Sequence, residues 1–451
     1  MKNRLAWFRD SLGTVLTLVV TVMRLFPHLS AIRRAEIVAI YPYIGFGDTI
    51  ADPDAASRLF PNKRCVFIFF SVPMQHNWKA ALLWRSSKVR LVFLPYNLKI
   101  GLLKSFGKYD CPTWYRRMAP VLTMKFAKTL VGAHATVMSS DAMEESHKLY
   151  PFTDAEKDSL SRIIPNHRWA IAYTRLVREV PVPSLHLPET LRSQVHRKLQ
   201  TVLPSSMEKR NVPRCCLYLR QKSVFAKRYG KVILPVRDTV RDGSPLEDYL
   251  DGVRLLNKGG YQVLLTGDAT LSDAMYRDFH GMLVDAAHSH TNHQVFYLYA
   301  ATESDIFIGE VGGGTWLPGI NQIPRLLLNT YPYFYGFPRS WMYYKQVIDE
   351  KGTQVPCRKL FWEHTYDWSI PGMKILNNTR EEITEAIDQY LKDVKTPWNQ
   401  NPNDDAGIEF PLGSWIRHSG AKFSPAWLRR YGTSDMASSA DTKHTIAQAR
   451  A

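Results

Sequence analysis

Cysteine is scarce in this chain. Its five cysteines form no CxxC pair and no His/Cys ligand spacing, and their number is odd: Cys65, Cys111, Cys215, Cys216 and Cys357. These absences argue against a disulfide framework and a cysteine zinc site, and favour a reducing cytoplasm. His288, His290 and His293 also lack companion carboxylates at ligand spacing. We therefore expect no metal ion and no cofactor.

The N-terminus lacks an apolar run of membrane-spanning length, which is about 20 residues. The run from Ser11 to Met23 is shorter and has arginines on both sides, among them Arg9 and Arg24. No small-residue cleavage site follows it, which argues against a signal peptide. We expect a helix in the headgroup region of an anionic membrane surface. A helix packed on the protein's own surface, and an uncleaved signal or short span, stay open.

Acidic residues are too few to balance the basic ones. The chain has 58 Lys and Arg against 41 Asp and Glu, a formal charge of +17. This excess favours a polyanionic partner such as nucleic acid, an anionic membrane or a phosphorylated ligand. The sequence has no recognised nucleic-acid-binding motif and spreads its charge along the chain, so we expect no nucleic acid partner.

What the chain does have is an alternating α/β pattern, and its 451 residues exceed one usual hydrophobic core. Short β-branched or aromatic runs at 37–42, 65–72 and 89–95 predict buried parallel strands. Asp52 and Pro53 predict the N-cap and first turn of a helix. Residues 113–132 predict a longer helix that Pro120 kinks or splits, and WAIAYTRL (169–176) is interpreted as a strand.

A second series follows, with strands expected at 215–223, 261–268, 305–310 and 325–329. The fold class is therefore α/β, with two Rossmann-like doubly wound domains facing a cleft and an amphipathic N-terminal helix. The expected parts are a membrane-associating helix, an acceptor domain, a donor domain and a polar tail, at 1–34, 35–212, 213–395 and 396–451.

The strand ends carry the candidate site residues. Gly312, Gly313, Gly314 and Thr315 lie between a strand and a predicted helix, where backbone N–H groups and the helix N-terminus would hold a diphosphate. A tight turn that needs positive φ explains the same glycines.

Arg220 ends another strand and is followed by Lys222; both would grip phosphate oxygens, or form a solvated basic loop. After Gly267, Asp268 would accept from a sugar hydroxyl or cap the next helix. Glu310 is either a hydroxyl acceptor or a charge at a helix N-terminus.

Three stretches carry a family resemblance: GFGD (45–48), LNKGGYQVLLTGD (256–268) and ATESDIFIGEVGGGTWLPGINQIPRLLLN (301–329). With them, residues 35 to 345 resemble GT-B glycosyltransferases. The resemblance is to uncharacterised bacterial enzymes encoded with surface-polysaccharide genes, and more distantly to heptosyltransferases and nodulation-type fucosyltransferases. In that group a hydroxyl and a carboxylate usually follow the first glycine of the turn. Here Glu310 and Val311 replace them.

The resemblance implies a nucleotide-sugar donor on the C-terminal domain and a glycan or lipid-linked acceptor on the N-terminal domain, at the cytoplasmic face of the inner membrane. Gly45 and Gly47 would let a loop bend toward the acceptor, and Asp48 would take the proton from its hydroxyl without a metal. Asp52 is the second choice of base, and a turn-stabilising role for Asp48 stays open.

Two other classes fit the sequence. One is a GT-B-like nucleotide-sugar epimerase, and the other is a non-catalytic carbohydrate-binding or nucleic-acid-binding module.

Overall fold

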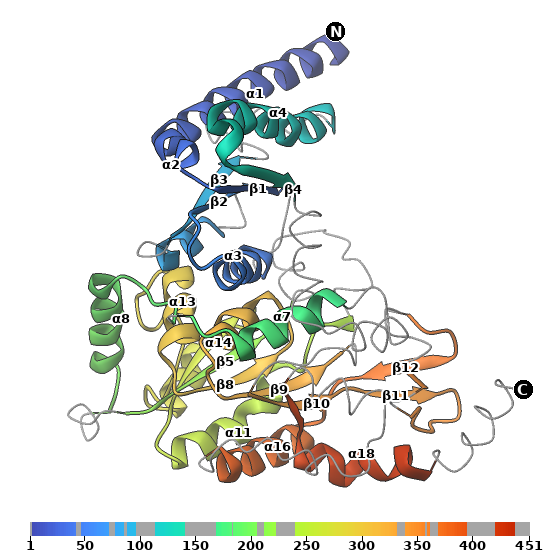
Figure 1. Ribbon diagram of the computed structural model, residues 1–451. Helices are drawn as coiled ribbons and strands as arrows, with labels where there is room; N and C mark the ends of the chain where they lie inside the picture. The colour runs from blue at the N-terminus through green and yellow to red at the C-terminus, as the bar shows by residue number, and fades with distance from the viewer. Residues whose placement is uncertain are drawn as a thin grey trace, which may run out of the picture. The chain divides into compact units, whose positions relative to one another are not determined.

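The computed structural model divides the chain into two compact units (Figure 1). Unit 1 comprises Met1–Tyr150 and Val180–Pro188, and unit 2 comprises Pro151–Glu179 and Glu189–Ala451. The boundary lies earlier than expected, because residues 151–179 and 189–212 belong with the second unit. The structure describes residues 2–41, 47–71, 77–84, 88–95, 113–139, 168–182, 184–204, 212–221, 240–331, 339–356, 359–360, 369–394 and 420–437.

Unit 1 is built on a four-stranded parallel sheet in the order β3-β2-β1-β4. Its strands are β1 (Ile37–Tyr41), β2 (Cys65–Ser71), β3 (Val89–Pro95) and β4 (Thr136–Ser139). Its helices are α1 (Lys2–Leu25), α2 (Leu29–Arg33), α3 (Asp48–Leu59) and α4 (Thr113–Val131), with 3-10 turns η1 (Phe26–His28), η3 (Asn77–Trp84) and η5 (Gly132–His134).

The two faces of this sheet differ in chemistry. Alternate residues of the strands point to opposite faces. One face is aliphatic: Val38, Ile40, Val66 and Ile68 pack against residues of α2 and α4. The other is aromatic, with the rings of Tyr41, Phe67, Phe69 and Phe93 stacked or tilted against one another. Figure 1 shows α1, α2 and α4 on one side of the sheet and α3 on the other.

The helix after β1 starts earlier than predicted. It begins at Asp48, so Asp52 lies inside it and is not its N-cap, and Pro53 is an interior residue. Gly47 is the N-cap and has φ −55°, an ordinary helical value, so the freedom expected of this glycine is not used there. Gly45 lies outside the described residues. Farther along, α4 runs through Pro120 as one helix, so the proline does not split it.

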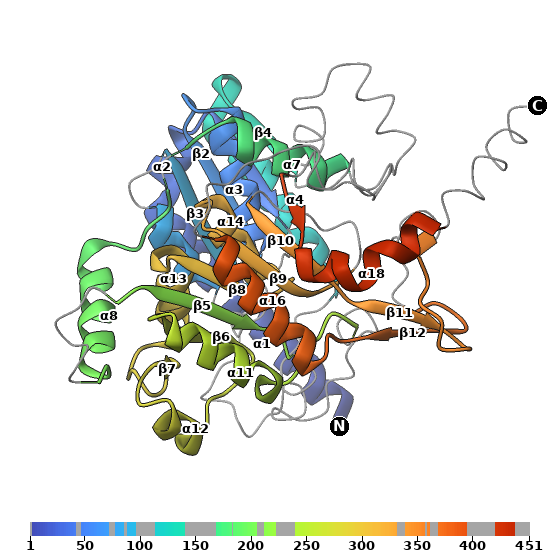
Figure 2. The same ribbon diagram turned by 90° about the horizontal axis from the view of Figure 1, so that it is seen from below.

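Unit 2 is built on a seven-stranded parallel sheet in the order β13-β10-β9-β8-β5-β6-β7 (Figure 2). These strands are β5 (Arg214–Leu219), β6 (Gln262–Gly267), β7 (Leu283–Val284), β8 (Ile306–Glu310), β9 (Arg325–Thr330), β10 (Ser340–Tyr344) and β13 (Lys422–Phe423). A separate antiparallel pair is formed by β11 (Gln346–Asp349) and β12 (Met373–Leu376).

The helices of unit 2 cover both faces of its sheet. Figure 1 places α11 and α16 on one face and α13 and α14 on the other. The helical segments are α7 (Arg168–Glu179), α8 (Glu189–Thr201), α11 (Leu246–Lys258), α12 (Asp273–Asp278), α13 (His293–Glu303), η7 (Gly313–Thr315), α14 (Trp316–Ile320), α16 (Arg380–Asp393) and α18 (Pro425–Ala437). Parallel sheets with helices on both faces confirm the predicted α/β class.

Two segments of unit 2 differ from the sequence expectation. WAIAYTRL is part of helix α7, because its buried residues Tyr173, Leu176 and Val177 repeat at helical and not at strand spacing. Residues 420–437, expected in a polar tail, supply strand β13 and helix α18. Trp427 of α18 is almost fully buried and stacks on Phe423, so this part of the C-terminal region belongs to the core.

A buried ion pair in unit 1 provides a stability test. Arg58 makes two hydrogen bonds to Asp54, at 2.7 and 3.1 Å, and also donates to the Val180 carbonyl. Arg58→Ala leaves a buried carboxylate without its main partner and should lower the free energy of unfolding by about 3–5 kcal/mol. The control is Arg64→Ala, which removes the exposed contact with Glu36 and should cost under about 1 kcal/mol. Urea denaturation measures both; equal effects would contradict the assignment.

Candidate functional site

The sheet of unit 2 has the strand order of a dinucleotide-binding fold. Numbered along the chain from β5, the strands β7-β6-β5-β8-β9-β10 read 3-2-1-4-5-6. After β5 the chain adds β6 and β7 on one side of that strand, and it later returns to add β8 on the other side. In open α/β sheets, ligands bind in the crevice at the carboxyl ends of the strands, at such a switch point. The candidate ligand-binding residues are therefore those at the ends of β5 and β8.

The carboxylate of Glu310, the last residue of β8, is the centre of this edge. Its side chain is fully buried. Oε2 accepts from the backbone N–H of Arg220 at 2.6 Å, and Oε1 accepts from the Tyr249 hydroxyl at 2.8 Å and the Asn329 amide at 3.2 Å. Burial raises the pKa of the Glu310 carboxyl, and these hydrogen bonds oppose the rise. Glu310 therefore joins the ends of β5 and β9 to α11, a positioning role that replaces the expected contact with a ligand hydroxyl.

The backbone around Glu310 fits it closely. A Cβ atom on Gly243 would lie 1.5 Å from Glu310 Oε1, so this position needs a glycine. The Gly243 N–H donates to the Arg220 carbonyl at 2.9 Å. Asn329 and Asn378 each donate a backbone N–H to the other's side-chain oxygen, both at 2.6 Å. The loop before α11 and the end of β9 are thereby fixed against the end of β5.

Lys345 adds a buried positive charge near the same network. Its ammonium donates to the carbonyls of Val240 and Asp242 and to the Asn377 side chain, at 2.6–2.7 Å. Burial lowers the pKa of Lys345, while the charge of Glu310 opposes that shift. The two charges partly compensate each other in the interior.

Gly267 and Asp268 hold the end of β6 against β5. Gly267 has φ +93°, and a Cβ there would lie 2.1 Å from the Leu219 carbonyl oxygen. Asp268 donates its N–H to that same oxygen and accepts from the Gln221 N–H at 3.1 Å. The cap of the following helix α12 is Ser272, so the helix-capping alternative for Asp268 is wrong. Its half-buried carboxylate remains at the carboxyl edge beside the loop after β5.

The glycine turn after β8 packs on the ring of Tyr218. A Cβ on Gly314 would lie 2.4 Å from that ring, and one on Gly312 would lie 3.1 Å from its hydroxyl and 3.4 Å from Cδ of Arg220. The glycines thus bring the turn and the Arg220 side chain together. Gly312 has an extended φ of −172°, so close approach to Tyr218 and Arg220, and not positive φ, is what favours a glycine there.

The carbonyls of this turn are bound from within the protein. Gly312 O accepts from the Thr315 hydroxyl at 2.8 Å, and Gly314 O accepts from Tyr297 at 2.8 Å. Thr315 is fully buried, so its hydroxyl closes the turn and does not serve as the expected ligand contact. The Gly313 N–H belongs to the same planar peptide as the Gly312 carbonyl and points the opposite way. The predicted helix is a single 3-10 turn followed by the five residues of α14, which leaves little helix dipole for an anion.

The structure thus brings together at one edge Arg220, Gly267, Asp268, Glu310 and the 312–315 turn, while Lys222 lies outside the described residues. The sequence analysis missed Tyr218, Gly243, Tyr249 and Asn329, which fix their positions. The sequence held a signal for Asn329, because it is a polar residue that closes the apolar run RLLLN (325–329). In the structure it is the penultimate residue of β9 and has φ +49°, a conformation that asparagine tolerates better than most residues.

Asp48 lies in unit 1 as the first residue of α3. Because α3 returns antiparallel to the strands it connects, its first residue lies at the carboxyl edge of that sheet. This is the edge at which an open α/β sheet binds its ligands.

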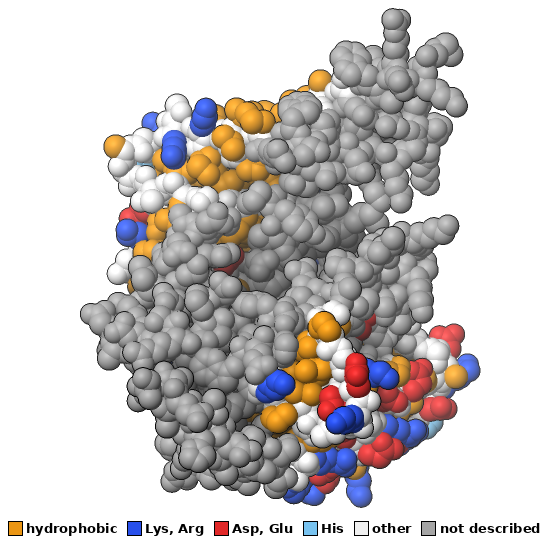
Figure 3. Space-filling model, turned by 90° about the vertical axis from the view of Figure 1, so that its right-hand side faces the viewer, with side chains coloured by type: hydrophobic (Ala, Val, Ile, Leu, Met, Phe, Trp, Pro, Cys, Tyr) orange, Lys and Arg blue, Asp and Glu red, His pale blue; other side chains and the backbone are white. Residues whose placement is uncertain are grey.

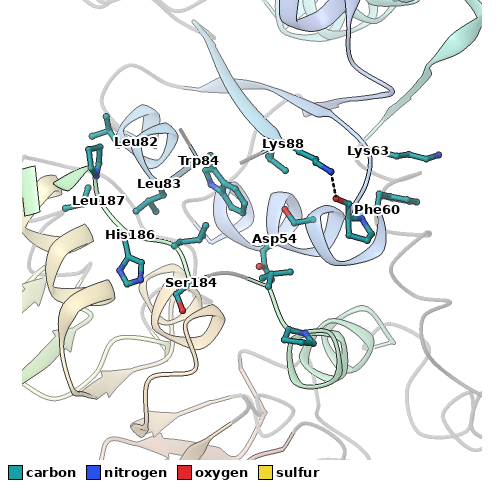
Figure 4. Close-up of a pocket in the computed structure, with 17 residues that line it drawn as sticks. Asp54, Phe60, Lys63, Leu82, Leu83, Trp84, Lys88, Ser184, His186 and Leu187 are labelled. Carbon is teal, nitrogen blue, oxygen red and sulfur yellow. Dashed lines mark hydrogen bonds between the residues drawn. The ribbon is translucent and has the colours of Figure 1, made fainter. Parts of the chain in front are cut away.

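Unit 1 also contains a pocket of about 560 Å³ (Figure 4). Its walls are the second half of α3, the end of η3, the Pro181–Pro188 segment and residues that precede β2 and β3, including Lys63 and Lys88. Lys88 and Lys63 come just before their strands, so the pocket lies at the amino-terminal edge of the sheet. It is therefore separate from the edge at which Asp48 lies.

Comparisons with known proteins find similarity only to solved structures, and at low identity. No family model matches, and no curated protein matches. Similar solved structures include a family 9 glycosyl transferase from Veillonella parvula, 13% identical over 68% of this chain and 85% of that one, with a TM-score of 0.37. Another is the E. coli ADP-heptose lipopolysaccharide heptosyltransferase II, 15% identical over 68% and 89%, with a TM-score of 0.33. A third is the wall teichoic acid polymerase TagF, 13% identical over 71% and 78%, with a TM-score of 0.24. The first two are named as sugar transferases, the class that the sequence resembles. At these identities and TM-scores, none of the three structures assigns the chain to a family.

The Glu310 network predicts a specific pH dependence. A carboxyl whose pKa is raised on folding stabilises the protein below its ordinary pKa of 4.5, and that contribution is lost as pH rises through the raised value. The contribution of Glu310 to stability should therefore fall from pH 4.5 toward neutrality. Glu310→Gln should abolish this fall. It should also lower the free energy of unfolding by about 1–3 kcal/mol, because one buried acceptor is replaced by a donor.

Urea denaturation across this pH range measures the effect. The matched control is Glu247→Gln on the exposed side of α11, which should keep the native slope. A native slope in Glu310→Gln would show that another group carries the dependence.

Proposed function

We propose that the protein is a glycosyltransferase that moves a sugar from a nucleotide-diphosphate-sugar donor to a glycan or lipid-linked acceptor of a bacterial surface polysaccharide. One observation carries the proposal. Arg220 and the glycine turn meet at the switch point of a sheet with dinucleotide-binding strand order. The resemblance of residues 35–345 to GT-B enzymes supports it.

The donor's diphosphate would bind between Arg220 and the 312–315 turn. A guanidinium binds phosphate oxygens through paired hydrogen bonds, and the Gly313 N–H adds a neutral donor. In sugar transfer the diphosphate leaves with the electron pair of the glycosidic bond, so its negative charge grows in the transition state. Positive charge held in place at this edge stabilises that change and needs no reorganisation during the reaction. Asp268, half-buried on the neighbouring strand, is suited to accept from a donor hydroxyl.

Asp48 would be the general base of an inverting transfer. The acceptor hydroxyl must lose a proton as its oxygen attacks the anomeric carbon, and a carboxylate within about 3 Å can take it. Asp52 is less suited to this role, because it is buried within α3. The site of action would be the cytoplasmic face of the inner membrane, with the protein attached peripherally.

Donor binding is tested first. One of the diphosphate forms of uridine, guanosine, adenosine or cytidine, or CMP, should raise the melting temperature, because a ligand that binds only the folded state stabilises it. Arg220→Ala should remove at least most of this ligand-induced shift, and Arg220→Lys should keep part of it. The control is Arg254→Ala, an exposed arginine of α11. Absence of a shift for every nucleotide in the native protein would contradict the donor site.

Catalysis is tested separately. Asp48→Asn should lower kcat by about 10²–10⁴-fold while the nucleotide-induced melting shift stays native, since a base acts on the acceptor. Asp52→Asn is the comparison. If Asp52→Asn loses activity and Asp48→Asn keeps it, the base is misassigned. Turnover of the donor with no acceptor requirement would instead indicate an epimerase, and nucleotide-free glycan binding would indicate a carbohydrate-binding protein.

A further inference from the structure

Helix α1 buries polar side chains against the protein and exposes large apolar ones. Thr17 faces the protein and is fully buried, whereas Val22 and Phe26 just beyond it are 64% and 71% exposed. The Thr21 hydroxyl donates to the Thr17 carbonyl at 2.8 Å, so this hydroxyl is satisfied without water. A helix on a water-exposed surface normally turns its large apolar side chains inward. The outer side of α1 is therefore suited to an apolar medium.

Helix α4 has the same arrangement. Ala119, Thr123 and Ala127 are small or hydroxylated and buried, and the Thr123 hydroxyl donates to the Ala119 carbonyl at 2.8 Å. Val131 is also buried, at the end of the helix. Several large apolar side chains nevertheless point outward, among them Leu122, which is 52% exposed. We call the exposed apolar residues of both helices the α1/α4 surface: Val15, Leu18, Val19, Val22, Met23, Phe26, Met118, Val121, Leu122 and Phe126.

The two helices present this surface on the same side of unit 1. Residues of α2 and α4 pack on the aliphatic face of the sheet, and Leu25 at the end of α1 packs against the same cluster. Figure 1 shows α1, α2 and α4 together on that face. Their outer sides therefore point away from the sheet in a common direction. Contiguous exposed apolar areas of this kind mark protein or membrane interaction sites.

The charges around the α1/α4 surface are all of one sign. Arg24, Arg33, Arg34, Lys125 and Lys128 are exposed. The sequence has no Asp or Glu at residues 14–34 or 118–135. In Figure 3 the coloured area at the upper left shows many hydrophobic side chains with Lys and Arg among them, and an acidic side chain at its edge. Apolar side chains with flanking basic residues match the chemistry of a bilayer with anionic headgroups.

We propose that α1 and α4 together form one docking surface that inserts into the headgroup layer of an anionic bilayer. Contrary to the expectation from the sequence, the stretch Thr14–Arg33 is, by length and composition alone, long and apolar enough to cross a membrane, with a mean hydropathy of 1.8 and 11% of it buried. However, Thr17 is packed against the unit, and the α-helix gives way to a 3-10 turn at Phe26–His28. The helix therefore lies in the membrane plane. This goes beyond an N-terminal anchor, because α4, about 90 residues farther along the chain, forms half of the contact.

The test is vesicle co-sedimentation of the full chain. Phosphatidylcholine vesicles that contain phosphatidylglycerol should bind the protein, and pure phosphatidylcholine vesicles should bind it less. The double variant Leu122→Glu/Phe126→Glu should bind at least about tenfold more weakly. Lys125→Glu/Lys128→Glu should reduce binding to the anionic vesicles by about fivefold per charge and weaken its salt dependence. The matched control is Leu376→Glu, an equivalent change at an exposed leucine of β12 in unit 2.

Each outcome decides the proposal. Native binding by Leu122→Glu/Phe126→Glu, with loss in Val19→Glu/Val22→Glu, would restrict the anchor to α1 and overturn the assignment of α4. No vesicle binding, together with a dimer that the α4 variant converts to a monomer, would show that a second copy covers the surface. All the substituted apolar side chains are exposed, so the melting temperature should stay at or above the native value. Vesicle binding does not require the donor site, so this test and the nucleotide test fail independently.

Discussion

The buried carboxylate of Glu310 is the interaction on which the carboxyl edge of the sheet in unit 2 depends. It accepts from the N–H of Arg220, the residue that follows β5, and from side chains of α11 and β9. A buried acid is costly unless its oxygens are satisfied, so the loops that supply these donors have little freedom to move. This constraint fixes where the Arg220 side chain leaves the sheet, and it explains why position 243 must be glycine.

At the same edge, a structural role and the proposed binding role fall on one segment. The ring of Tyr218 leaves no room for a side chain at Gly314 and little at Gly312, and the carbonyls of these two residues accept hydrogen bonds from Tyr297 and Thr315. Because the carbonyls of Gly312 and Gly314 are held in place, the peptide N–H groups of the turn point in fixed directions. A site that binds a diphosphate needs donors preorganised in this way. The tight-turn explanation and the anion-binding proposal for residues 312–315 are therefore compatible.

The sequence predicted the parts of the fold that depend on local pattern. The apolar runs at 65–72, 89–95 and 325–329 are strands, because buried parallel strands read as continuous apolar segments. Prediction from the sequence failed where contacts between distant parts of the chain determine the structure. Helix α3 begins four residues before Asp52, α7 was taken for a strand, and Glu310 is buried by partners up to 90 residues away in sequence. The inward threonines of α1 could not be recognised either, since the packing face of a helix is set by the sheet beneath it.

The central claim is that a nucleotide diphosphate binds at the carboxyl ends of β5 and β8. Hydrogen–deuterium exchange of the intact chain, with and without the nucleotide that raises its melting temperature, tests it most directly. The account predicts that protection from exchange increases in peptides that contain Arg220, Asp268 and residues 312–315, and changes little on the opposite edge near Gln262 and Leu283. Protection confined to other regions, or none at these strand ends when the nucleotide is bound, would contradict it.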